Sequence, residues 1–558
     1  MASSGDGSCS AAFDGIIDNR EELLRELDIA DAGISDAELL LRCHQAWGAD
    51  CARRIVGDFG FAIWDGRRQE LLVVRDPLGV RPLYYTRRGS TLLFATQIHQ
   101  LFAHDATSGE IDPEYFGDYL VSGLGVRAAT PYRDIKRLRP AHMLIAVGGD
   151  VRIERYWDID PDRSIVYDRP EEYVERFREQ LSAAIRTYLR DSGIVWSDLS
   201  GGFDSTSIVS LAQEMFRAGE VSLTGFATVT QFYPEAKLSD ERRWAQAVID
   251  KYGFEAHFLD GDRHHPFTDF LEGGRWWDEP SAQIAFHALL REYVGLFSAA
   301  GVDALLTGIG AESVITDSLP LPLHLADHLR RLELRSLWRE LHEWSAARGV
   351  PLSNMFLWSC LKPLLMPTRM EFMPPYSYRV APWVNRDFAK RYDLPQRAHY
   401  VWGEKRFKSP VAQWQYEKII RITSFFLRGT VDKSVRIRYP FMYRPLVEFL
   451  TSVPHSAKIA PKRTKPLLLN AMTGIMPDDV RTKRTHSTTG HAVYLSFVRS
   501  WPQLEELVRD PILCRLGYVD RGRLVEACKT AKYGYSDNLH MLISTLSAES
   551  WLRSSRAA

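Results

Sequence analysis

The stretch that most constrains this chain is the octet Leu199-Ser200-Gly201-Gly202-Phe203-Asp204-Ser205-Thr206. A short apolar run, Ile194 to Trp196, precedes it, and apolar residues at helical spacing follow it from Ile208 to Met215. This order predicts a buried strand, a glycine turn and a helix. Glycines let the backbone approach a ligand closely, and a helix N-terminus offers unpaired N–H groups to an anion. The octet therefore predicts a polyphosphate-binding loop, with a plain glycine turn before a helix as the less favoured alternative.

The acidic residue of this loop indicates a cation. Asp204 would repel bare phosphate, so it favours a bridging metal ion, most simply Mg²⁺. The loop has neither the G-x-x-x-x-G-K-S/T spacing of a Walker A loop nor the G-x-G-x-x-G spacing of a dinucleotide loop. It resembles the pyrophosphate loop of the ATP pyrophosphatases, and its L-S-G-G-x-D-S-S/T form is most similar to the asparagine synthetase superfamily.

That resemblance implies an enzyme that cleaves ATP to AMP and pyrophosphate while it adenylates a carboxylate. It also implies which residues bind the nucleotide. These are Leu199, Ser200, Gly201, Gly202, Asp204, Ser205 and Thr206 of the loop, with Gly308 and Gly310 of a later glycine turn.

Strands and helices alternate around the loop. We expect a helix over Glu171–Arg190, then strands at Leu223–Val229, Ala256–Leu259 and Val302–Thr307, with a helix over Asp240–Tyr252. This alternation predicts a parallel sheet whose ligand lies at the carboxyl ends of the strands. The expected fold class is α/β, and the resemblance makes it an ATP-pyrophosphatase (adenine nucleotide α-hydrolase-like) synthetase domain over residues 171–558, after a linker over 156–170.

The first 155 residues have a different pattern. With 558 residues, the chain is long enough for two or more domains. Short strands separated by Gly, Pro and Arg turns predict a strand-rich α+β domain over residues 1–155. The phrases F-D-G-I-I-D-N-R-E-E-L, G-D-F-G-F-A-I-W-D and R-D-P-L-G-V-R-P-L-Y-Y resemble the glutamine amidotransferase (Ntn-type) domain that precedes the synthetase domain in this superfamily.

This amidotransferase-like domain is expected to be truncated and inactive. A glutaminase of this type uses an N-terminal cysteine as nucleophile, whereas position 2 is Ala2 and the first cysteine is Cys9. The early strands of the resembled family are missing, and Asp14 replaces its oxyanion-binding asparagine, where a carboxylate would repel an oxyanion. Processing to expose Cys9 as nucleophile is the less favoured alternative.

A second acidic residue and two lysines complete the expected site. Thr307-Gly308-Ile309-Gly310-Ala311-Glu312-Ser313 resembles a family phrase whose aspartate is the second Mg²⁺ ligand, so Glu312 is expected to bind the metal with Asp204, with a helix-start glutamate as the alternative. The resemblance also implies a late lysine on the pyrophosphate. Lys465 and Lys483 are the candidates, with surface basicity as the alternative for each and an uncertain alignment that could put His486 in the lysine's place.

The residues expected near the nucleophile differ from those of the best-known relatives. Asparagine synthetases have a glutamate, and β-lactam synthetases a tyrosine, where this chain has Ile309, which cannot move a proton. Tyr443 replaces an aspartate of the family phrase Y-P-F-L-D and is the residue we single out for proton transfer, with unaided attack by a neutral amine, after it loses its proton to water, as the alternative. Asp278-Glu279-Pro280 resembles a family turn and is expected to have a positioning role at most.

Further phrases are similar to the lasso peptide cyclases, one branch of the superfamily. They are A-P-W-V-N-R-D-F from Ala381 and the closing Leu546-Ser547-Ala548-Glu549-Ser550-Trp551-Leu552-Arg553. Residues 320–430 are predicted to be helical, and the aromatic and cationic residues of Arg369–Tyr378 and Trp383–Phe388 suggest a peptide-binding surface or, equally, a helical core. The first expectation is therefore macrolactam formation between an Asp or Glu side chain and the N-terminal amine of a precursor core peptide. The alternatives are a small-molecule amide ligase, such as an asparagine or β-lactam synthetase, and a non-catalytic peptide-binding scaffold.

The composition of the chain excludes some classes of binding partner. A net charge of −1 gives no electrostatic case for nucleic acid or an anionic membrane. The six cysteines have no C-x-x-C pair, and no secretion signal or run of 18 apolar residues is visible, so we expect a reduced, cytoplasmic protein without a structural zinc. The expected partners are the precursor core peptide and, in the same pathway, a leader-binding protein and a leader protease; ATP and Mg²⁺ are the expected cofactors.

Overall fold

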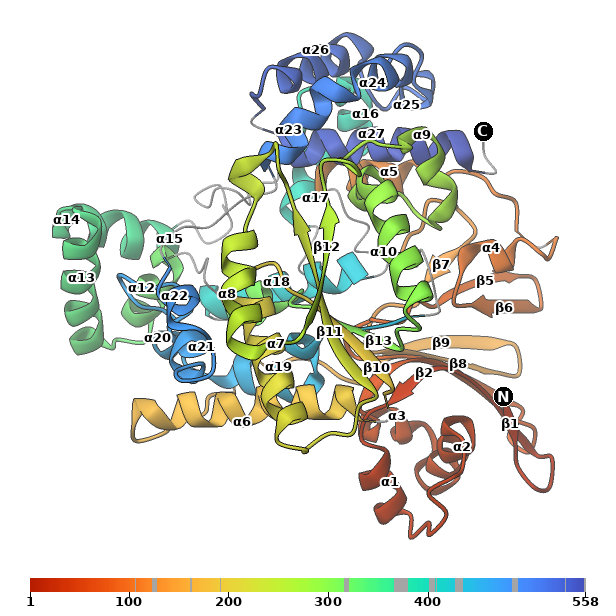
Figure 1. Cartoon of the computed structure of the whole chain (residues 1–558). Coiled ribbons are helices and arrows are strands. Elements are labelled where there is room, and N and C mark those ends of the chain that lie inside the picture. Colours follow the sequence, from red (N-terminus) through yellow and green to blue (C-terminus); the bar gives the residue numbers. More distant parts are fainter. Residues whose placement is uncertain are drawn as a thin grey trace.

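The computed structural model describes the chain except for residues 106, 123–127, 161–162, 191, 316–320, 366–379, 401–406, 408, 427–434, 484–489, 537 and 556–558. Figure 1 shows a strand-rich N-terminal part beside a larger part that is built around a second sheet, with helices above and to the left of that sheet. Among the described residues, none of the helices has the length and the apolar content needed to cross a bilayer.

Parallel strands form the sheet of the larger part. In the described chain the strand order is β12 (Glu255–Asp260), β11 (Gly225–Phe232), β10 (Ile194–Asp198), β13 (Ala304–Leu306) and β14 (Arg436–Arg438), and every neighbouring pair is parallel. The chain runs outward from β10 to β12 on one side and from β13 to β14 on the other, so the strand order reverses at β10. Ligands of open parallel sheets bind at this switch point. The short edge strand β14 was not expected from the sequence.

Helices cover both faces of this sheet. On one face the core packs α6 (Pro170–Leu189), α7 (Phe203–Arg217), α8 (Arg242–Tyr252), α19 (Arg444–Ser452) and α21 (Pro466–Ala471). On the other face Trp196 and Val229 pack against α10 (His287–Ala299). Figure 1 shows α7 and α8 on the side of the sheet opposite α10. The expected helices over 171–190 and 240–252 match α6 and α8 to within a few residues.

The N-terminal part is a layered α+β domain. In the described chain its main sheet is antiparallel, in the order β1 (Ala2–Ser3), β2 (Cys9–Ile17), β3 (Gly57–Asp65), β4 (Glu70–Arg75), β8 (His142–Val147) and β9 (Asp150–Arg155). One face packs on α1 (Arg20–Glu26), α2 (Asp36–Trp47) and α3 (Cys51–Arg54), and the other on a smaller sheet of β5 (Tyr84–Arg88), β6 (Thr91–Ala95) and β7 (Lys136–Arg137). The Ser35 side chain caps α2 and forms a reciprocal capping box with Glu38.

The two parts share a core. Helix α5 (Pro113–Ser122) belongs to the N-terminal part in sequence, yet it packs on α27 (Leu539–Ser554), with the Phe116 and Trp551 ring centroids 6.2 Å apart. The same core includes helices from the C-terminal end: α23 (Gly490–Arg499), α24 (Trp501–Leu507), α25 (Ile512–Arg515) and α26 (Arg521–Lys532). The segment expected as a linker is also packed, because the buried Tyr156 donates to the Arg75 carbonyl and Trp157 donates to Glu448.

Buried ion pairs join the parts as well. Arg438 of β14 contacts the carboxylates of Asp18 and Asp58 in the N-terminal domain. Glu279 accepts hydrogen bonds from Tyr84 at 2.8 Å and Tyr115 at 3.1 Å, and it pairs with Arg137. The Asp278-Glu279-Pro280 turn therefore holds the N-terminal domain in place, a positioning role at the boundary between the two parts.

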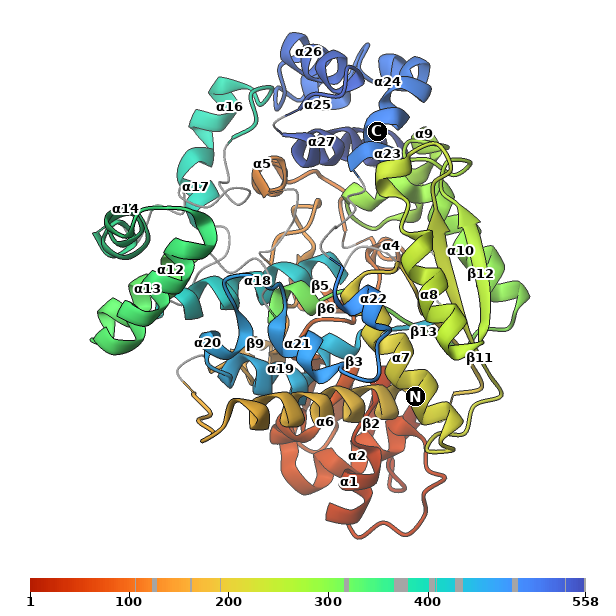
Figure 2. The ribbon, with the colours of Figure 1, turned by 60° about the vertical axis from the view of Figure 1, so that its left-hand side comes forward.

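A separate helical lobe lies beside the sheet. It comprises α12 (Leu321–Arg330), α13 (Leu334–Arg348), α14 (Leu352–Phe356), η5 (Leu357–Leu361) and α15 (Lys362–Leu365). Its small core contains Leu325, Leu341 and Trp344. Figure 2 shows α12, α13 and α14 away from the strands of both sheets. This lobe and α18 (Pro410–Phe426) supply the helical character expected for residues 320–430.

Candidate active site

The glycine loop connects the central strand β10 to α7 and takes a shape that side chains would prevent. Gly201 has φ +78°, and a Cβ there would lie 2.8 Å from the Trp244 Cβ and 3.0 Å from the Glu241 carbonyl oxygen. Gly202 is the N-cap of α7. The loop backbone therefore presses against α8 on one side and opens the helix N-terminus to an anion on the other.

Hydroxyl groups hold the loop together. Ser205 Oγ accepts from the Ser200 backbone N–H at 3.2 Å and lies 3.0 Å from Ser200 Oγ, which in turn accepts from the Gly202 N–H. Thr206 is fully buried, and its Oγ1 has no hydrogen-bond partner among the described residues. The leading residue, Leu199, is buried in the core beneath the loop. Oxygen and amide groups thus line the place at which the sequence predicts phosphate.

Lys465 faces the acidic residue of the loop. Its ammonium donates to both carboxylate oxygens of Asp204, at 2.8 and 2.6 Å. Lys465 has φ +44° and caps α21, where Pro466 begins the helix. An uncommon backbone conformation thus directs this nearly buried cation toward the loop. The structure brings Lys465 and Asp204 together from positions 261 residues apart in the sequence.

Lys483 contacts the backbone of the glycine loop. Its ammonium donates to the Gly201 carbonyl oxygen at 2.8 Å and lies 3.1 Å from Glu241 Oε1. It also lies 5.4 Å from the ring centroids of both Phe203 and Trp244. Both candidate lysines therefore reach the loop, but on different sides: Lys465 contacts the loop carboxylate, and Lys483 contacts the loop backbone. Residue 486, the alternative candidate, lies outside the described residues.

The second glycine turn lies against the first. Its Gly308 has no room for a side chain, because a Cβ would lie 2.9 Å from the Ser205 nitrogen and 3.1 Å from the Asp204 Cβ. Gly310 has φ +96° and packs on Met442. Glu312 follows in the first turn of α11 (Ala311–Val314), where it is exposed and its carbonyl accepts from Lys418 at 3.3 Å. The exposed carboxylate of Glu312 thus starts a helix at the same sheet edge as Asp204.

A carboxylate that was not singled out from the sequence lies directly before the loop. Asp198 is the last residue of β10, remains partly exposed, and shares a side-chain hydrogen bond with Thr307 at the end of β13. Burial raises the pKa of Asp198 to about 6, against the opposing effect of the Thr307 hydrogen bond. The signal was present in the sequence, since an acidic residue rarely ends an apolar strand without a polar partner.

Two tyrosines surround Asp198. Burial, followed by the charge of Asp198, raises the pKa of Tyr293 on α10. Burial also raises the pKa of Tyr439, where Asp58 and Asp198 both contribute. Asp198 at the end of β10, Thr307 after β13 and Tyr439 after β14 therefore lie near one another at the carboxyl edge of the sheet.

Tyr443, singled out from the sequence for proton transfer, has different neighbours. Its ring meets Tyr188 of α6 edge-on at 5.7 Å, and burial raises its pKa. Among the described contacts, none joins Tyr443 to the loop, to Asp204 or to Glu312. Tyr439, which precedes Pro440 in the same phrase, is a tyrosine on which the charge of Asp198 acts.

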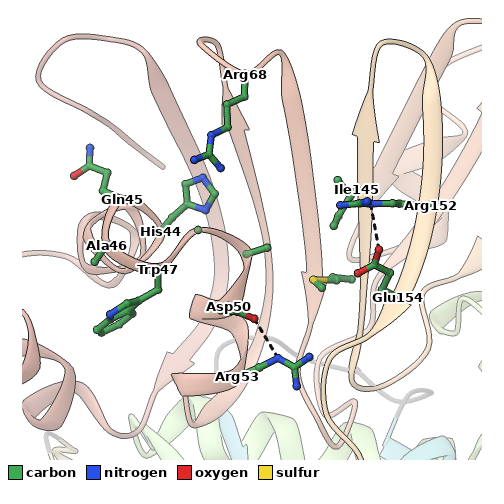
Figure 3. Close-up of a pocket in the computed structure, with 13 residues that line it drawn as sticks. His44, Gln45, Ala46, Trp47, Asp50, Arg53, Arg68, Ile145, Arg152 and Glu154 are labelled. Atoms are coloured by element: carbon green, nitrogen blue, oxygen red, sulfur yellow. Dashed lines mark hydrogen bonds and ion pairs between the residues drawn. The ribbon is translucent and has the colours of Figure 1, made fainter.

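A hollow of about 560 Å³ lies in the N-terminal domain. Figure 3 shows it between the end of α2, with His44 and Trp47, the turn after β3 that carries Arg68, and β9, which carries Arg152 and Glu154. Neither Cys9 nor Asp14, the positions compared with the glutaminase nucleophile and oxyanion residue, lines it. Cys9 is buried in β2 beneath the helices, and Asp14 lies 3.8 Å from Arg81.

The fold and the loop define the class of protein. A parallel sheet whose switch point carries a loop of glycines and hydroxyls, with a carboxylate and lysine at its mouth, is an ATP-pyrophosphatase domain, here preceded by an antiparallel amidotransferase-like domain. The glutamine amidotransferase family model matches residues 1–157, and the asparagine synthase family model matches residues 176–553. The chain therefore belongs to the asparagine synthase family and is an ATP-dependent, amide-forming carbon–nitrogen ligase.

Three curated proteins illustrate the relationship. The chain is 25% identical over 553 residues to glutamine-hydrolysing asparagine synthetase 3 of Bacillus subtilis, a match that covers 93% of this chain and 81% of that protein. It is 26% identical over 552 residues to amidase chry2 of Gibberella zeae, covering 88% and 77%. It is 24% identical over 499 residues to glutamine-hydrolysing asparagine synthetase 1 of Bacillus subtilis, covering 85% and 74%.

Proposed function

We propose that this ligase closes a macrolactam, joining the side-chain carboxylate of an Asp or Glu in a short precursor peptide to the N-terminal amine of the same peptide. The observation that carries the choice of substrate is Ile309. Ile309 lies between Gly308 and Gly310 and is 36% exposed. The resembled asparagine synthetases have a glutamate at this position. An apolar side chain there suits a larger acyl substrate better than it suits ammonia and free aspartate.

The first half of the reaction is adenylation. A carboxylate oxygen of the peptide attacks the α-phosphorus of ATP, the bond to the pyrophosphate oxygen breaks, and an acyl-adenylate forms. Ser200, Ser205 and the N–H groups of Gly201 and Gly202 would bind the departing pyrophosphate. Lys483 keeps the loop in shape through the Gly201 carbonyl.

Magnesium fits this site through its oxygen ligands. Asp204 keeps 20% of its side chain exposed, and Glu312 is exposed at the same sheet edge. Carboxylate oxygens are the ligands that Mg²⁺ prefers, and the ion would neutralise charge on the pyrophosphate. Lys465 occupies both Asp204 oxygens, so we propose that its ammonium moves from the carboxylate to the pyrophosphate when nucleotide and metal bind.

The second half is aminolysis, for which Asp198 is the proposed general base. The amine nitrogen bonds to the acyl carbon, the carbon–oxygen bond to AMP breaks, and the ammonium proton passes to the Asp198 carboxylate. A base with a pKa of about 6 is ionised at neutral pH and still accepts a proton readily. Thr307 would orient this carboxylate, and its Oγ1 also accepts from the Ile309 backbone at 3.4 Å.

Exposed aromatic side chains support a peptide substrate. On the helical lobe Trp338, Phe356 and Trp358 are exposed, and Lys362 lies 4.0 Å from the Trp358 ring centroid. Clusters of aromatic residues and cations are common in peptide-binding surfaces. Of the two segments singled out from the sequence, Trp383–Phe388 contributes Trp383 and Phe388 to the core, and Arg369–Tyr378 lies outside the described residues.

The structure of the N-terminal domain supports the proposal that the attacking amine does not come from glutamine. Cys9 could be an N-terminal nucleophile only after residues 1–8 were removed, but Ala2 and Ser3 form β1 and pair with β2. Asp14 would put a negative charge where the resembled glutaminases bind an oxyanion. We therefore propose that this domain is catalytically silent.

Asparagine synthesis is the second candidate. The match to the asparagine synthase model and the names of two of the three relatives favour it. It would need ammonia from solution or a glutaminase activity from the N-terminal domain. Free aspartate would then be the carboxylate that is adenylated.

Release of AMP separates these functions. The full chain is incubated with Mg·ATP and either synthetic core peptides that contain an internal Asp or Glu, the matching Asn or Gln peptides, or free aspartate with ammonia. We expect AMP only with the acidic peptides, together with a product 18 mass units lighter than the substrate peptide. AMP with aspartate and ammonia would establish asparagine synthesis instead. AMP with none of them would contradict both functions and favour a peptide-binding scaffold.

A further inference from the structure

Two histidines and a glutamate converge in the helical lobe of residues 321–365. His324 and His328 are four residues apart on α12, so their rings share one helix face, with centroids 4.6 Å apart. Glu340 of α13 reaches both rings: Oε2 lies 2.6 Å from His324 Nε2, and Oε1 lies 3.2 Å from His328 Nε2. One potential ligand atom from each residue lies within 4.8 Å of the other two.

A fourth side chain orients His328. Glu333 Oε2 lies 2.6 Å from His328 Nδ1, so the Nδ1–H can donate to this carboxylate while Nε2 faces Glu340. Histidines that bind metals are commonly held this way, with the second ring nitrogen donating to a carboxylate. This contact sets the tautomer and gives the Nε2 lone pair a defined direction.

The cluster is largely shielded from water and contains two carboxylates. His324 and Glu340 are buried, whereas Glu333 lies half-exposed against His328. With neutral imidazoles, the two glutamates carry two negative charges. A divalent cation would balance that charge and satisfy the Nε2 lone pairs at the same time.

We propose that His324, His328 and Glu340 bind one divalent transition metal ion, with Zn²⁺ as the ion that fits best. Two imidazoles and one carboxylate form a ligand set that Zn²⁺ accepts, and a water molecule would complete the tetrahedron. Ligands in such a tetrahedron are about 3.3 Å apart. The 2.6 and 3.2 Å contacts therefore need only small side-chain rotations to accommodate the ion. The expectation of no structural zinc came from the spacing of the cysteines and did not include histidine and glutamate ligands.

The site would tie α12 to α13 in a lobe that has few core residues of its own. Figure 2 shows α12 and α13 beside each other and away from the sheet that carries the glycine loop. We therefore assign the metal a structural role in this lobe, independent of the ligase reaction and of the proposed peptide substrate.

Metal analysis of the full chain tests the proposal. The protein is incubated with one equivalent of Zn²⁺, freed of loose metal by gel filtration, and assayed by mass spectrometry of the element. We expect about one zinc per chain and a rise in the melting temperature relative to protein treated with a chelator. Co²⁺ in place of Zn²⁺ should give the visible absorption bands of a tetrahedral site.

Variants identify the ligands. His328→Ala and Glu340→Gln should lose the zinc, and Glu333→Gln, which leaves all three ligands in place, should weaken zinc binding on the order of 10- to 100-fold. His342→Ala is the matched control, because His342 lies on α13 against Trp338, away from this cluster. Asp204→Ala should keep its zinc. No zinc in the parent chain, or equal zinc in the parent and His328→Ala, would overturn the proposal and leave a hydrogen-bonded histidine–glutamate network.

Discussion

The Lys465 ammonium donates to both carboxylate oxygens of Asp204, and the lysine is almost completely buried. The residue proposed to bind metal and the residue proposed to bind pyrophosphate therefore neutralise each other in this structure. Each must be released for the other to meet its ligand. This relationship changes what a substitution of Asp204 should do.

Asp204→Ala should abolish AMP formation and also lower stability. A nearly buried ammonium that loses its carboxylate costs about 1–3 kcal/mol. The double variant Asp204→Asn with Lys465→Met should recover most of that stability and stay inactive. Denaturant unfolding and an AMP assay on the three proteins measure both effects. Ligase activity retained in Asp204→Ala would rule out the proposed role of the loop.

Asp198→Asn should change the pH dependence of the reaction. In the parent, kcat/KM should rise with pH through about 6 and then level off, because only the ionised carboxylate accepts a proton. The variant should be slower by about 10²- to 10⁴-fold and should lack this rise. Asp50→Asn, a surface change in an exposed pair with Arg53, is the control. A parent profile kept intact in Asp198→Asn would exclude Asp198 as the base.

The stabilising contribution of Asp198 should fall as the pH rises, whereas its contribution to the rate should increase. Its pKa is raised from 3.8 to about 6 by burial, so the folded state binds this proton more tightly than the unfolded state does. Its contribution to stability is present below about pH 4 and is lost as the pH rises through 6. The difference in unfolding free energy between Asp198→Asn and the parent should therefore favour the variant more at pH 7 than at pH 4.

Lys483→Met should weaken ATP binding while leaving Asp204 and Lys465 paired. Losing a charged hydrogen bond to the Gly201 carbonyl costs about 1.5–3 kcal/mol, which corresponds to about 10- to 100-fold in affinity. Glu241→Gln keeps this hydrogen bond and should have a smaller effect. Nucleotide titration by calorimetry measures both, and equal affinities in the two variants would show that Lys483 does not shape the loop.

AMP formation should depend on the negative charge of residue 312 more than on the length of its side chain. Glu312→Asp retains a carboxylate at the sheet edge and should keep AMP formation, with an altered Mg²⁺ requirement. Glu312→Gln should lose most of the activity, because an amide is a weaker ligand for Mg²⁺. Activity measured against Mg²⁺ concentration tests this pair. If Glu312→Gln behaved like the parent, Glu312 would be an ordinary helix-start residue.

Much of the fold could be predicted from the sequence because the pattern is local. The apolar run before the octet, the glycines within it and the helical spacing after it define β10, the loop and α7 without help from distant residues. Strand β14 was missed because three residues, Arg436–Arg438, with charged ends carry no strand pattern. Pairing with β13 determines that strand.

The loop residues of the candidate site could be named from the sequence for the same reason. Lys465 and Lys483 were both candidates for the pyrophosphate, and nothing in the sequence distinguishes Lys465, which faces Asp204, from Lys483, which donates to the loop backbone. Tyr443 was singled out by its place in a phrase, and its part in proton transfer stays a prediction, while the charge of Asp198 acts on Tyr293 and Tyr439. Contacts between residues far apart in sequence decide these cases, and only the folded chain brings them together.

The buried Arg137–Glu279 pair has a larger consequence than its position suggests. Together with Arg438, which pairs with Asp18 and Asp58, it attaches the N-terminal 157 residues to the domain that contains the parallel sheet. A synthetase fragment cut free of them would expose the shared core and leave Glu279 and Arg438 without these charge partners, so we expect it to be insoluble. The N-terminal domain is therefore a structural component of the synthetase, whether or not it hydrolyses glutamine.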